Sequence, residues 1–482
     1  MRIKTSNKIV LNNSTGSLIT IKISIMKNSI LLLVLLISLG CFGQRYPDFK
    51  SLRYDENYSF LKNDTVKNDW YKTMKFLPLS SSQKYYISFG GNIRYQYFYA
   101  KNENWGDGPQ DNDGYILSRF LLHADFHAGK FFRAFVQTQS SLADGRIDPS
   151  PVDQDPLEVH QAFADFNFVN EKSKKLILRA GRQELTYGSQ RLVAVRDGPN
   201  NRQSFDGVKL ITAKDNISGD FFYSHFVVAR DGIFDDHSSK DRQLWGSYFV
   251  INKVPVIKNI DVYYLGYKRT KASFNDGAGK ETRHSVGTRI WGKSENWRYD
   301  GEVVYQFGDF ASKNISAWTA SINAGYRFNE VKFHPELSFK AEAISGDKEV
   351  GDNGLQTFNP LFPRGAYFGL ASVIGPANLI DFHPSISLQL SKSVDWVIDY
   401  DMFWRYSSND GIYAPNTILI YPGDTTTAKK IGNQLESEII WQPNPYLYFR
   451  LEGTWFNAGE YIKASGTGKD IFFAGITMQL NF

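Results

Sequence analysis

The residues best suited to chemistry are basic side chains concentrated in one stretch of the chain. Six of them lie between residues 179 and 209, against three acidic residues. A guanidinium presents two parallel N–H donors to a carboxylate, so arginines in series suit a polyanion such as a polyuronate. A basic outer loop that touches lipopolysaccharide phosphates is the alternative. The stretch therefore predicts either a site for an anionic sugar or a contact with lipopolysaccharide.

Other charged residues of both signs lie on the polar faces of alternating segments. Arg119, His123 and Asp125, for example, share one face. If these segments cross a membrane, a basic side chain facing lipid at mid-depth costs about 2–4 kcal/mol, so the polar faces must point inward. There they either form salt bridges that fill a closed lumen or make a ladder of sites for a charged solute. The residues predicted to line this lumen are Arg119, His123, Arg133, Arg179, Arg182, Arg191, Arg202, Lys209, Arg298, Arg327, Lys340, Arg405 and Arg450.

Catalytic and metal-binding patterns are weak. No serine or carboxylate follows His160 in a nucleophile motif, and no His/Cys cluster has zinc spacing. Two acidic loops offer oxygen ligands for calcium, although neither matches an EF-hand. They contain Asp107, Asp111 and Asp113 in the first loop and Asp347, Glu349, Asp352 and Asn353 in the second. Because solvated acidic loops are common, we assign no metal, and we expect no cofactor and no enzymatic activity.

The elements that position these residues are long alternating strands. From about Tyr86 onward apolar and polar residues alternate with period two, as in segments 318–328, 331–343 and 394–406. Such alternation indicates half-buried strands. Globular strands average five or six residues, whereas tilted membrane strands need roughly 9–11 to cross the apolar layer, and the segments here reach that length. Trp and Tyr lie near the ends of the apolar faces, as in the interface girdles of membrane barrels.

The connections between these segments alternate in length. Links after even-numbered strands are tight, whereas links after odd-numbered strands are mostly longer and rich in Gly, Asp and Asn. Short periplasmic turns and long outer loops are typical of outer-membrane barrels. The strands are expected near 86–100, 114–128, 131–143, 157–169, 175–187, 203–213, 218–230, 242–253, 258–271, 282–292, 296–308, 315–329, 331–346, 379–391, 394–407, 430–442, 446–458 and 469–482.

These features predict an all-β fold, a transmembrane antiparallel β-barrel of about 18 strands in the outer membrane of a Gram-negative bacterium. An even strand number puts the first and last strands' free ends, and so both ends of the barrel-forming chain, in the periplasm. The loop 188–202 then begins outside, and a loop of that length can fold back into the barrel mouth. Strict alternation puts Arg179 inside and Arg182 outside, so we expect a bulge or strand end near Gly181.

The ends of the chain carry export and assembly signals. The apolar run 30–39 follows Lys27 and precedes small residues, which predicts a signal peptide over 1–43 with cleavage after Gly43. Met26 is an alternative start, and a lipid-modified Cys41 is the alternative to cleavage. Residues 44–85 do not alternate and are expected to be a periplasmic segment or an N-terminal plug, followed by the barrel over 86–482. The last strand closes on Phe482, which resembles the signal read by the barrel-assembly machinery.

Overall charge excludes one class of partner. Residues 1–43 hold five basic residues and no acid, so the remainder carries 50 basic and 50 acidic residues and is neutral. A neutral chain gives no signal for nucleic acid. The expected partners are an anionic saccharide, outer-membrane lipid and lipopolysaccharide, and we expect a monomer. Any charge selectivity must come from where the charges lie.

Three segments resemble the alginate-export family of outer-membrane proteins. The most specific is 181–192 with 204–207, in which Gly181, Tyr187, Gly188, Gln190, Phe205 and Asp206 carry the likeness. The second is 358–363 with 378–380, and the third is 53–56 with 75–79. The resemblance implies an 18-strand barrel with an arginine-lined lumen that passes an anionic uronate polymer.

The resulting hypothesis is a channel that passes an anionic carbohydrate, such as a uronate oligomer or polymer. Inward carboxylates such as Asp399, Asp401 and Glu342 mix with the basic residues and leave a general or anion-selective porin open. Alternatives of another class are an outer-membrane barrel enzyme and a sealed structural or adhesive barrel. A conductance trace separates a channel from a sealed barrel.

Overall fold

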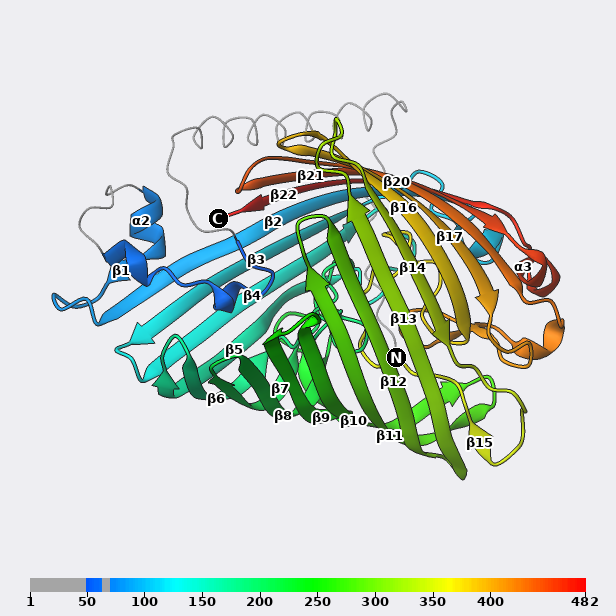
Figure 1. The fold of residues 1–482 in the computed structure, drawn as a ribbon, viewed down its shortest axis with the longest axis horizontal. Coiled ribbons are helices and arrows are strands. Elements are labelled where there is room, and N and C mark those ends of the chain that lie inside the picture. The colour runs from blue at the N-terminus through cyan, green and yellow to red at the C-terminus, as the bar shows by residue number, and fades with distance from the viewer. Residues whose placement is uncertain (1–48, 63–69) are drawn as a thin grey trace, which may run out of the picture. The chain divides into compact units, whose positions relative to one another are not determined.

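A closed antiparallel barrel dominates the computed structural model, which describes residues 49–62 and 70–482 (Figure 1). Its sheet has 20 strands, of which β1 (Leu77–Pro78) and β15 (Gly354–Leu355) are two-residue additions to the wall. The other 18 pair in chain order, and β2 (Tyr85–Lys101) closes the ring on β22 (Ile471–Asn481). The barrel class and the strand number predicted from alternation are confirmed.

The remaining wall strands are β3 (Tyr115–Ala128), β4 (Phe132–Asp144), β5 (Asp155–Asn170), β6 (Lys174–Gln183), β7 (Phe205–Lys214), β8 (Ile217–Val228), β9 (His237–Val254), β10 (Lys258–Phe274), β11 (Gly277–Lys293), β12 (Trp297–Phe310), β13 (Lys313–Arg327), β14 (Glu336–Ile344), β16 (Leu379–Ser391), β17 (Val394–Arg405), β20 (Lys430–Asn444) and β21 (Leu447–Ala458). Smaller elements are η1 (Arg53–Asp55), η2 (Ser59–Lys62), α2 (Trp70–Lys75), η3 (Glu103–Gly106), β18 (Ile412–Tyr413), β19 (Leu419–Tyr421), η4 (Gly423–Thr425) and α3 (Glu460–Ser465).

The two faces of the wall differ as a membrane barrel requires. Along β12 and β13, Val303 and Ile322 are each 54% exposed, whereas Val304 and Ala317 are fully buried. The exposed apolar side chains face the lipid, and the alternate side chains face the interior. Among the described residues, no helix is long and apolar enough to cross a membrane.

Ile322 and Asn323 give a test of this register. We expect Ile322→Arg to impair insertion by about 2–4 kcal/mol, because a guanidinium at mid-depth loses its hydration. Asn323→Arg, the matched control one residue along, should be tolerated because Asn323 lines an internal cavity. Heat-modifiable migration of the refolded barrel measures both, and equal tolerance at the two positions would contradict the register.

One predicted strand is shorter than expected. The segment 331–346 was predicted to be extended throughout, but β14 begins only at Glu336, and 328–335 forms a turn. Phe333 and His334 have positive φ values of 67° and 43°. Pro335 has no N–H to donate to a ladder. The apolar alternation continued through the turn, so the pattern alone did not mark where the pairing began.

The longest connections lie at one end of the barrel, and most of the short ones lie at the other. The links after β3, β5, β7, β9, β11, β16 and β20 have two or three residues, whereas the loops 184–204, 345–378 and 406–429 are the long ones. The exceptions are the two-residue links after β10 and β12 at the outer end and the eight-residue turn after β13 at the periplasmic end. The predicted pattern of tight periplasmic turns and mostly longer outer loops is otherwise confirmed. The predicted signal peptide, with Met26 and Cys41, lies outside the described residues.

The segment before the barrel contacts the inner wall near the periplasmic end. Tyr54 is buried between Phe135 and Phe163, and its hydroxyl donates to the Glu184 carbonyl over 2.9 Å. Arg53 donates to the carbonyls of Gly91 and Phe482, both at 2.8 Å, and so reaches the seam where the ring closes. The start of the described chain is therefore packed against lumen-facing residues.

Candidate anion site in the lumen

The loop 184–204 crosses the interior of the barrel. Arg191, near its middle, reaches Glu302 of β12 at 3.1 Å and Glu342 of β14 at 3.2 Å. It also donates to the Ser321 hydroxyl of β13. These strands lie across the barrel from β6 and β7, which hold the ends of the loop. The prediction that this outer loop folds back into the barrel is confirmed.

Residues of the 181–207 motif build the base of this loop. Gly181 has φ +129°, and a Cβ there would lie 2.3 Å from the Ala162 carbonyl oxygen, so glycine is required. Tyr187 stacks between Phe222 and Tyr248, with ring centroids at 5.2 and 5.0 Å. Of the other motif residues, Gly188 and Gln190 have positive φ, Phe205 is buried against Phe362, and Asp206 pairs with Arg182. The motif thus positions the loop, and its side chains are structural.

A second inward loop, 345–378, packs on the first. Val193 forms a parallel bridge with Phe362, and the Ala194 N–H donates to the Phe362 carbonyl over 2.9 Å. Asn359 donates to Glu281 of β11, and its own N–H donates to Gln306 of β12. The two segments that resemble the alginate-export family therefore meet inside the barrel and narrow it together.

Most of the predicted pore-lining residues carry a charge that is already paired. Arg179 forms a two-pronged pair with Asp165 directly opposite on β5, at 2.7 and 2.8 Å. The other pairs are Arg119–Asp197, Arg133–Asp125, Arg191–Glu302, Arg202–Glu184, Lys209–Asp220, Arg298–Glu336, Lys340–Glu342 and Arg450–Glu438. Internal salt bridging therefore accounts for much of the charge on the inner wall. In the same wall His123 stacks on Phe135, and Arg327 donates to Gln389.

Two of the predicted residues lie elsewhere. Arg182 lies on the face of the wall that points away from the lumen, as does the exposed Val208 on the neighbouring strand β7. Its guanidinium pairs with Asp206 near the extracellular end of β6. Arg405 is fully buried, and it donates to backbone carbonyls of the loop 406–429. The predicted assignment of these two side chains to the lumen does not match their contacts. Of the bulge or strand end expected near Gly181, no bulge is present, since β6 keeps its register with β5 and β7 through Gly181, and the strand ends two residues later at Gln183.

The outer side of the crossing loop holds a cavity of about 750 Å³, whose charged lining is basic apart from Asp236. Arg196, Arg242 and Lys271 line it, and none of the three has a carboxylate within ion-pair distance among residues 49–62 and 70–482. Burial and the neighbouring Arg242 guanidinium both lower the pKa of Arg196. Arg202 and Arg269 complete the basic lining but pair with Glu184 and Glu281. We call Arg196, Arg242 and Lys271 the free basic cluster.

Beside this cavity three guanidiniums converge on one residue, Asp197. Arg119 donates to the Asp197 carboxylate at 2.8 Å, and Arg94 donates to the Asp197 carbonyl at 2.6 Å. Burial raises the pKa of Asp197, but Arg119, Arg202 and Arg94 together lower it below its ordinary value. The surroundings of Asp197 therefore strongly favour a negative charge at this point of the lumen.

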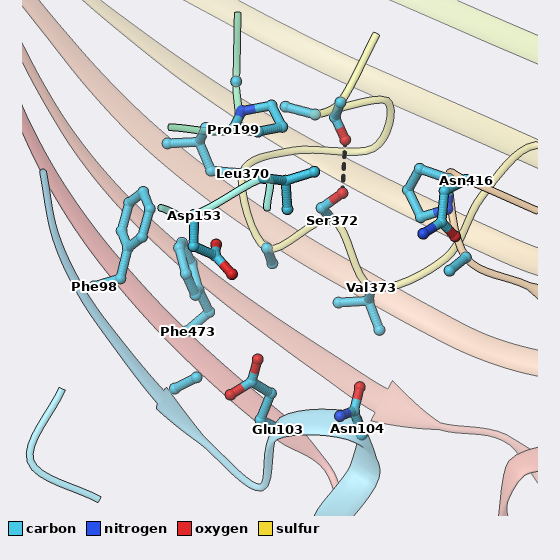
Figure 2. Close-up of a pocket in the computed structure, with 18 of the residues that line it drawn as sticks. Phe98, Glu103, Asn104, Asp153, Pro199, Leu370, Ser372, Val373, Asn416 and Phe473 are labelled. Carbon is cyan, nitrogen blue, oxygen red and sulfur yellow. Dashed lines mark hydrogen bonds between the residues drawn. The ribbon is translucent and has the colours of Figure 1, made fainter. Parts of the chain in front are cut away.

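A second outer cavity, of about 440 Å³, lies between the barrel wall and the two inward loops (Figure 2). Phe98 and Phe473 on the wall face Leu370 and Val373 of the loop 345–378, and Arg196 lines this cavity as well. Ser372 holds the loop by donating to the Gly365 carbonyl over 2.6 Å. The inner side of the crossing loop has a smaller cavity of about 190 Å³, which Lys340 and Arg364 line.

Sequence reasoning missed several of these residues. Arg94 and Arg242 were not singled out, and Arg196 was seen as part of the basic stretch but not assigned to the lumen. The signal available was the alternation of β2 and β9, which places Arg94 on the inner face. The first acidic loop is explained by contacts within the protein: Asp111 pairs with Arg146 at 2.7 Å, and Asp107 accepts from Thr467.

Comparison with known proteins gives one family match and a set of similar folds. The model of the alginate export family matches residues 85–470. No curated protein matches the chain significantly. Among solved structures, OprD of Pseudomonas aeruginosa is 12% identical, with a TM-score of 0.54 over 82% of this chain and 94% of that chain.

Two further structures from the same organism are similar. OccD3 (OpdP) is 12% identical, with a TM-score of 0.53 over 85% of this chain and 93% of that chain. OccK2 (OpdF) in complex with glucuronate is 11% identical, with a TM-score of 0.53 over 82% of this chain and 98% of that chain. At such low identity these likenesses show the fold alone.

Proposed function

The chain belongs to the alginate export family, and from that premise we propose that it passes a carboxylate-bearing carbohydrate, such as a uronate oligomer or polymer, across the outer membrane. It is an outer-membrane channel of a Gram-negative bacterium. The observation that carries the proposal is the free basic cluster, whose three side chains line the 750 Å³ outer cavity without carboxylate partners. A bound polyanion would supply the missing charge.

The arrangement suits passage better than tight capture. The free basic cluster lies outside the crossing loop, and Lys340 and Arg364 line the cavity inside it. Several weak sites in series let an anion enter, move on and leave. Two solved structures with a similar fold contain a carboxylate ligand. OccK2 (OpdF) was crystallised with glucuronate, and OpdK of Pseudomonas aeruginosa was crystallised with vanillate. Those ligands are compatible with an anionic client for this barrel.

One observation favours a second candidate, a barrel that is closed at rest. The loops 184–204 and 345–378 meet inside the lumen, and Arg191 fastens them to the far wall. A polymer could pass only if these loops moved. Conductance of the purified barrel in a planar bilayer separates the two candidates, since a sealed barrel gives no current.

The test of the free basic cluster is ion selectivity. We expect the wild-type channel to prefer anions, and we expect Arg196→Glu with Arg242→Glu to shift the reversal potential under a salt gradient toward cation selectivity. The shift should shrink at high salt, because charges exposed to water are screened. Short oligouronates should block the wild-type current in a concentration-dependent way and the double variant much less.

The matched control replaces two exposed lysines, Lys240 and Lys280, that lie on outer strand ends and do not line the basic cavity. Lys240→Glu with Lys280→Glu makes the same change in net charge. It should leave both selectivity and block nearly unchanged. Cation preference in the wild type, or an equal effect of both double variants, would contradict a local basic site and the uronate client.

A further inference from the structure

Three carboxylates from two separate segments meet beside the outer end of the barrel. Asp276 lies in the turn between β10 and β11, and Asp347 and Asp352 lie in the loop that follows β14. Ligand oxygens of the three lie within 4.8 Å of one another. The sequence showed Asp347 and Asp352 as an acidic loop, but Asp276 joins them only through the fold.

Asp347 is the unusual member of this group. Its side chain is fully buried, and no N–H or hydroxyl group of the described chain donates to either carboxylate oxygen; the polar group beside it is the Asp276 carboxyl. A buried polar group without a partner is costly, and a buried charge is costlier still. Its backbone N–H is used, since it donates to Asp410 over 2.8 Å. The vacant oxygens therefore point toward a missing positive partner.

Neighbouring groups do not supply that partner. Lys313 forms an ion pair with Asp276, but within the described chain no basic nitrogen lies within 4 Å of an Asp347 oxygen. Asp410 already accepts from Thr357, Tyr413 and two backbone N–H groups, so it adds negative charge nearby. Burial, a side-chain hydrogen bond with the Asp276 carboxyl that needs a proton on one of the two groups, and the charges of Asp276, Asp410 and Asp352 raise the pKa of Asp347 to about 7. With Lys313 counted, the three ionised carboxylates keep a net charge of −2.

The other two carboxylates are oriented by the backbone. Asp276 accepts the Gly351 N–H over 2.7 Å, and Asp352 accepts the Gly354 N–H over 2.7 Å. Gly351 has φ +90°, a conformation that favours glycine, and it brings the loop over Asp276. These bonds hold the Asp276 and Asp352 carboxylates close to Asp347 before any ligand binds.

We propose that Asp276, Asp347 and Asp352 form a divalent-cation site that takes calcium. Hard oxygen ligands with no imidazole or thiolate suit Ca²⁺ or Mg²⁺ rather than zinc. Ca²⁺ accepts bidentate carboxylates and flexible geometry, whereas Mg²⁺ demands a near-ideal octahedron. Bound calcium fastens the loop after β14 to the β10–β11 turn. It thereby steadies the start of the same loop 345–378 that narrows the lumen.

Calcium binding to the purified full-length barrel tests this proposal. Equilibrium dialysis with radiolabelled Ca²⁺ should show an event with a dissociation constant on the order of 10⁻⁴–10⁻³ M, as in extracellular modules. Asp347→Asn should weaken that event at least tenfold. Asp424→Asn is the matched control, because Asp424 is exposed on another outer loop and lies outside the cluster.

Thermal unfolding gives a second readout that a mere loss of fold would not imitate. Added Ca²⁺ should raise the unfolding temperature of the wild type and of Asp424→Asn, and chelator should reverse the rise. Asp347→Asn should match or exceed the wild type in chelator, since it removes an uncompensated buried charge, yet gain nothing from Ca²⁺.

The opposite results would overturn the site. Full calcium affinity in Asp347→Asn refutes it directly. A calcium event lost in Asp155→Asn but kept in Asp347→Asn would assign the ion to the separate cluster of Asp155, Glu158 and Asp236 instead. Absence of any calcium-dependent binding or stabilisation in the wild type would leave Asp347 as a protonated carboxyl and refute the proposal as well.

Discussion

Arg191→Met is expected to raise the conductance of the channel severalfold and to lower the stability of the folded barrel by about 3–5 kcal/mol. Arg191 lies mid-loop, buried to 8% exposure, and its fork joins Glu302 and Glu342 on the opposite wall. Methionine has a similar length but no charge. It therefore leaves the buried Glu302 and Glu342 carboxylates without the positive charge of Arg191. The loop 184–204 then loses its strongest tie to the far wall and should leave the lumen.

Single-channel recording measures the first effect, and the temperature of the heat-modifiable gel shift measures the second. Arg364→Met is the matched control, since Arg364 lines the same inner cavity but is exposed, and within the described chain its side chain bonds only to the Ala366 carbonyl. Adding Glu302→Gln and Glu342→Gln to Arg191→Met should recover stability while the conductance stays high. Unchanged conductance in Arg191→Met would mean that other contacts, such as the Val193–Phe362 bridge, hold the loop.

The alternation of apolar and polar residues predicted the strands of the barrel wall because successive residues of a strand face lipid and the lumen in turn. Lipid requires an apolar side chain, whereas the lumen accepts a polar one. Ile322 and Asn323 differ by one position and face different solvents, and the same alternation is seen along strands such as β2, β3 and β22. It weakens where the chain leaves the membrane. The residues 331–335 keep the apolar alternation but form a turn, because two positive φ values and a proline end the ladder.

Pairing of the charges could not be predicted to the same extent. Arg179 and Asp165 face each other across β5 and β6, so a correct register would have been enough to pair them. Arg191 pairs with Glu302 and Glu342, which are more than 100 positions away in the sequence. These two residues lie on β12 and β14, whereas the loop that carries Arg191 connects β6 and β7. Such partners depend on how a loop crosses the lumen, which alternation does not describe.

The residues left unpaired are harder still to predict. Arg196 and Arg242 look no different in sequence from Arg179 or Arg202. They differ from the other arginines only in the folded chain, where no carboxylate of the described residues pairs with them. Both line the outer cavity between β8, β9 and the inward loops. The sequence thus predicted a lumen lined by charges of both signs with one basic stretch, and the fold selects which of the basic side chains are available to a ligand.

Arg405 illustrates the opposite case, a predicted pore residue that holds loops together. Its guanidinium donates to the carbonyls of Ser408, Asp410, Gly423, Thr426 and Ala428 and lies 3.9 Å over the Tyr461 ring. No carboxylate pairs with Arg405 in the described chain. The negative ends of these carbonyl dipoles stabilise its positive charge instead. The loop 406–429 is wrapped around this one side chain.

Arg405→Met should therefore open the loop 406–429 while leaving the barrel wall intact. Five carbonyls lose a charged donor inside the protein, and each buried acceptor left without a partner costs about 1–3 kcal/mol, although those that reach water recover part of this. Limited proteolysis of the refolded barrel should cut within 406–429 at least tenfold faster than in the wild type. Arg298→Met is the matched control, since Arg298 is half-exposed near the periplasmic end of β12.

The same variant also separates a structural from a pore-lining role. Pro415, Asn416 and Ile418 of this loop line both outer cavities, so opening it should widen the outer mouth and weaken block by oligouronates. Removing a charge from the pore wall would instead change the reversal potential. A shifted reversal potential without faster proteolysis would return Arg405 to the lumen, whereas faster proteolysis with unchanged selectivity confirms that its positive charge is spent on the loop.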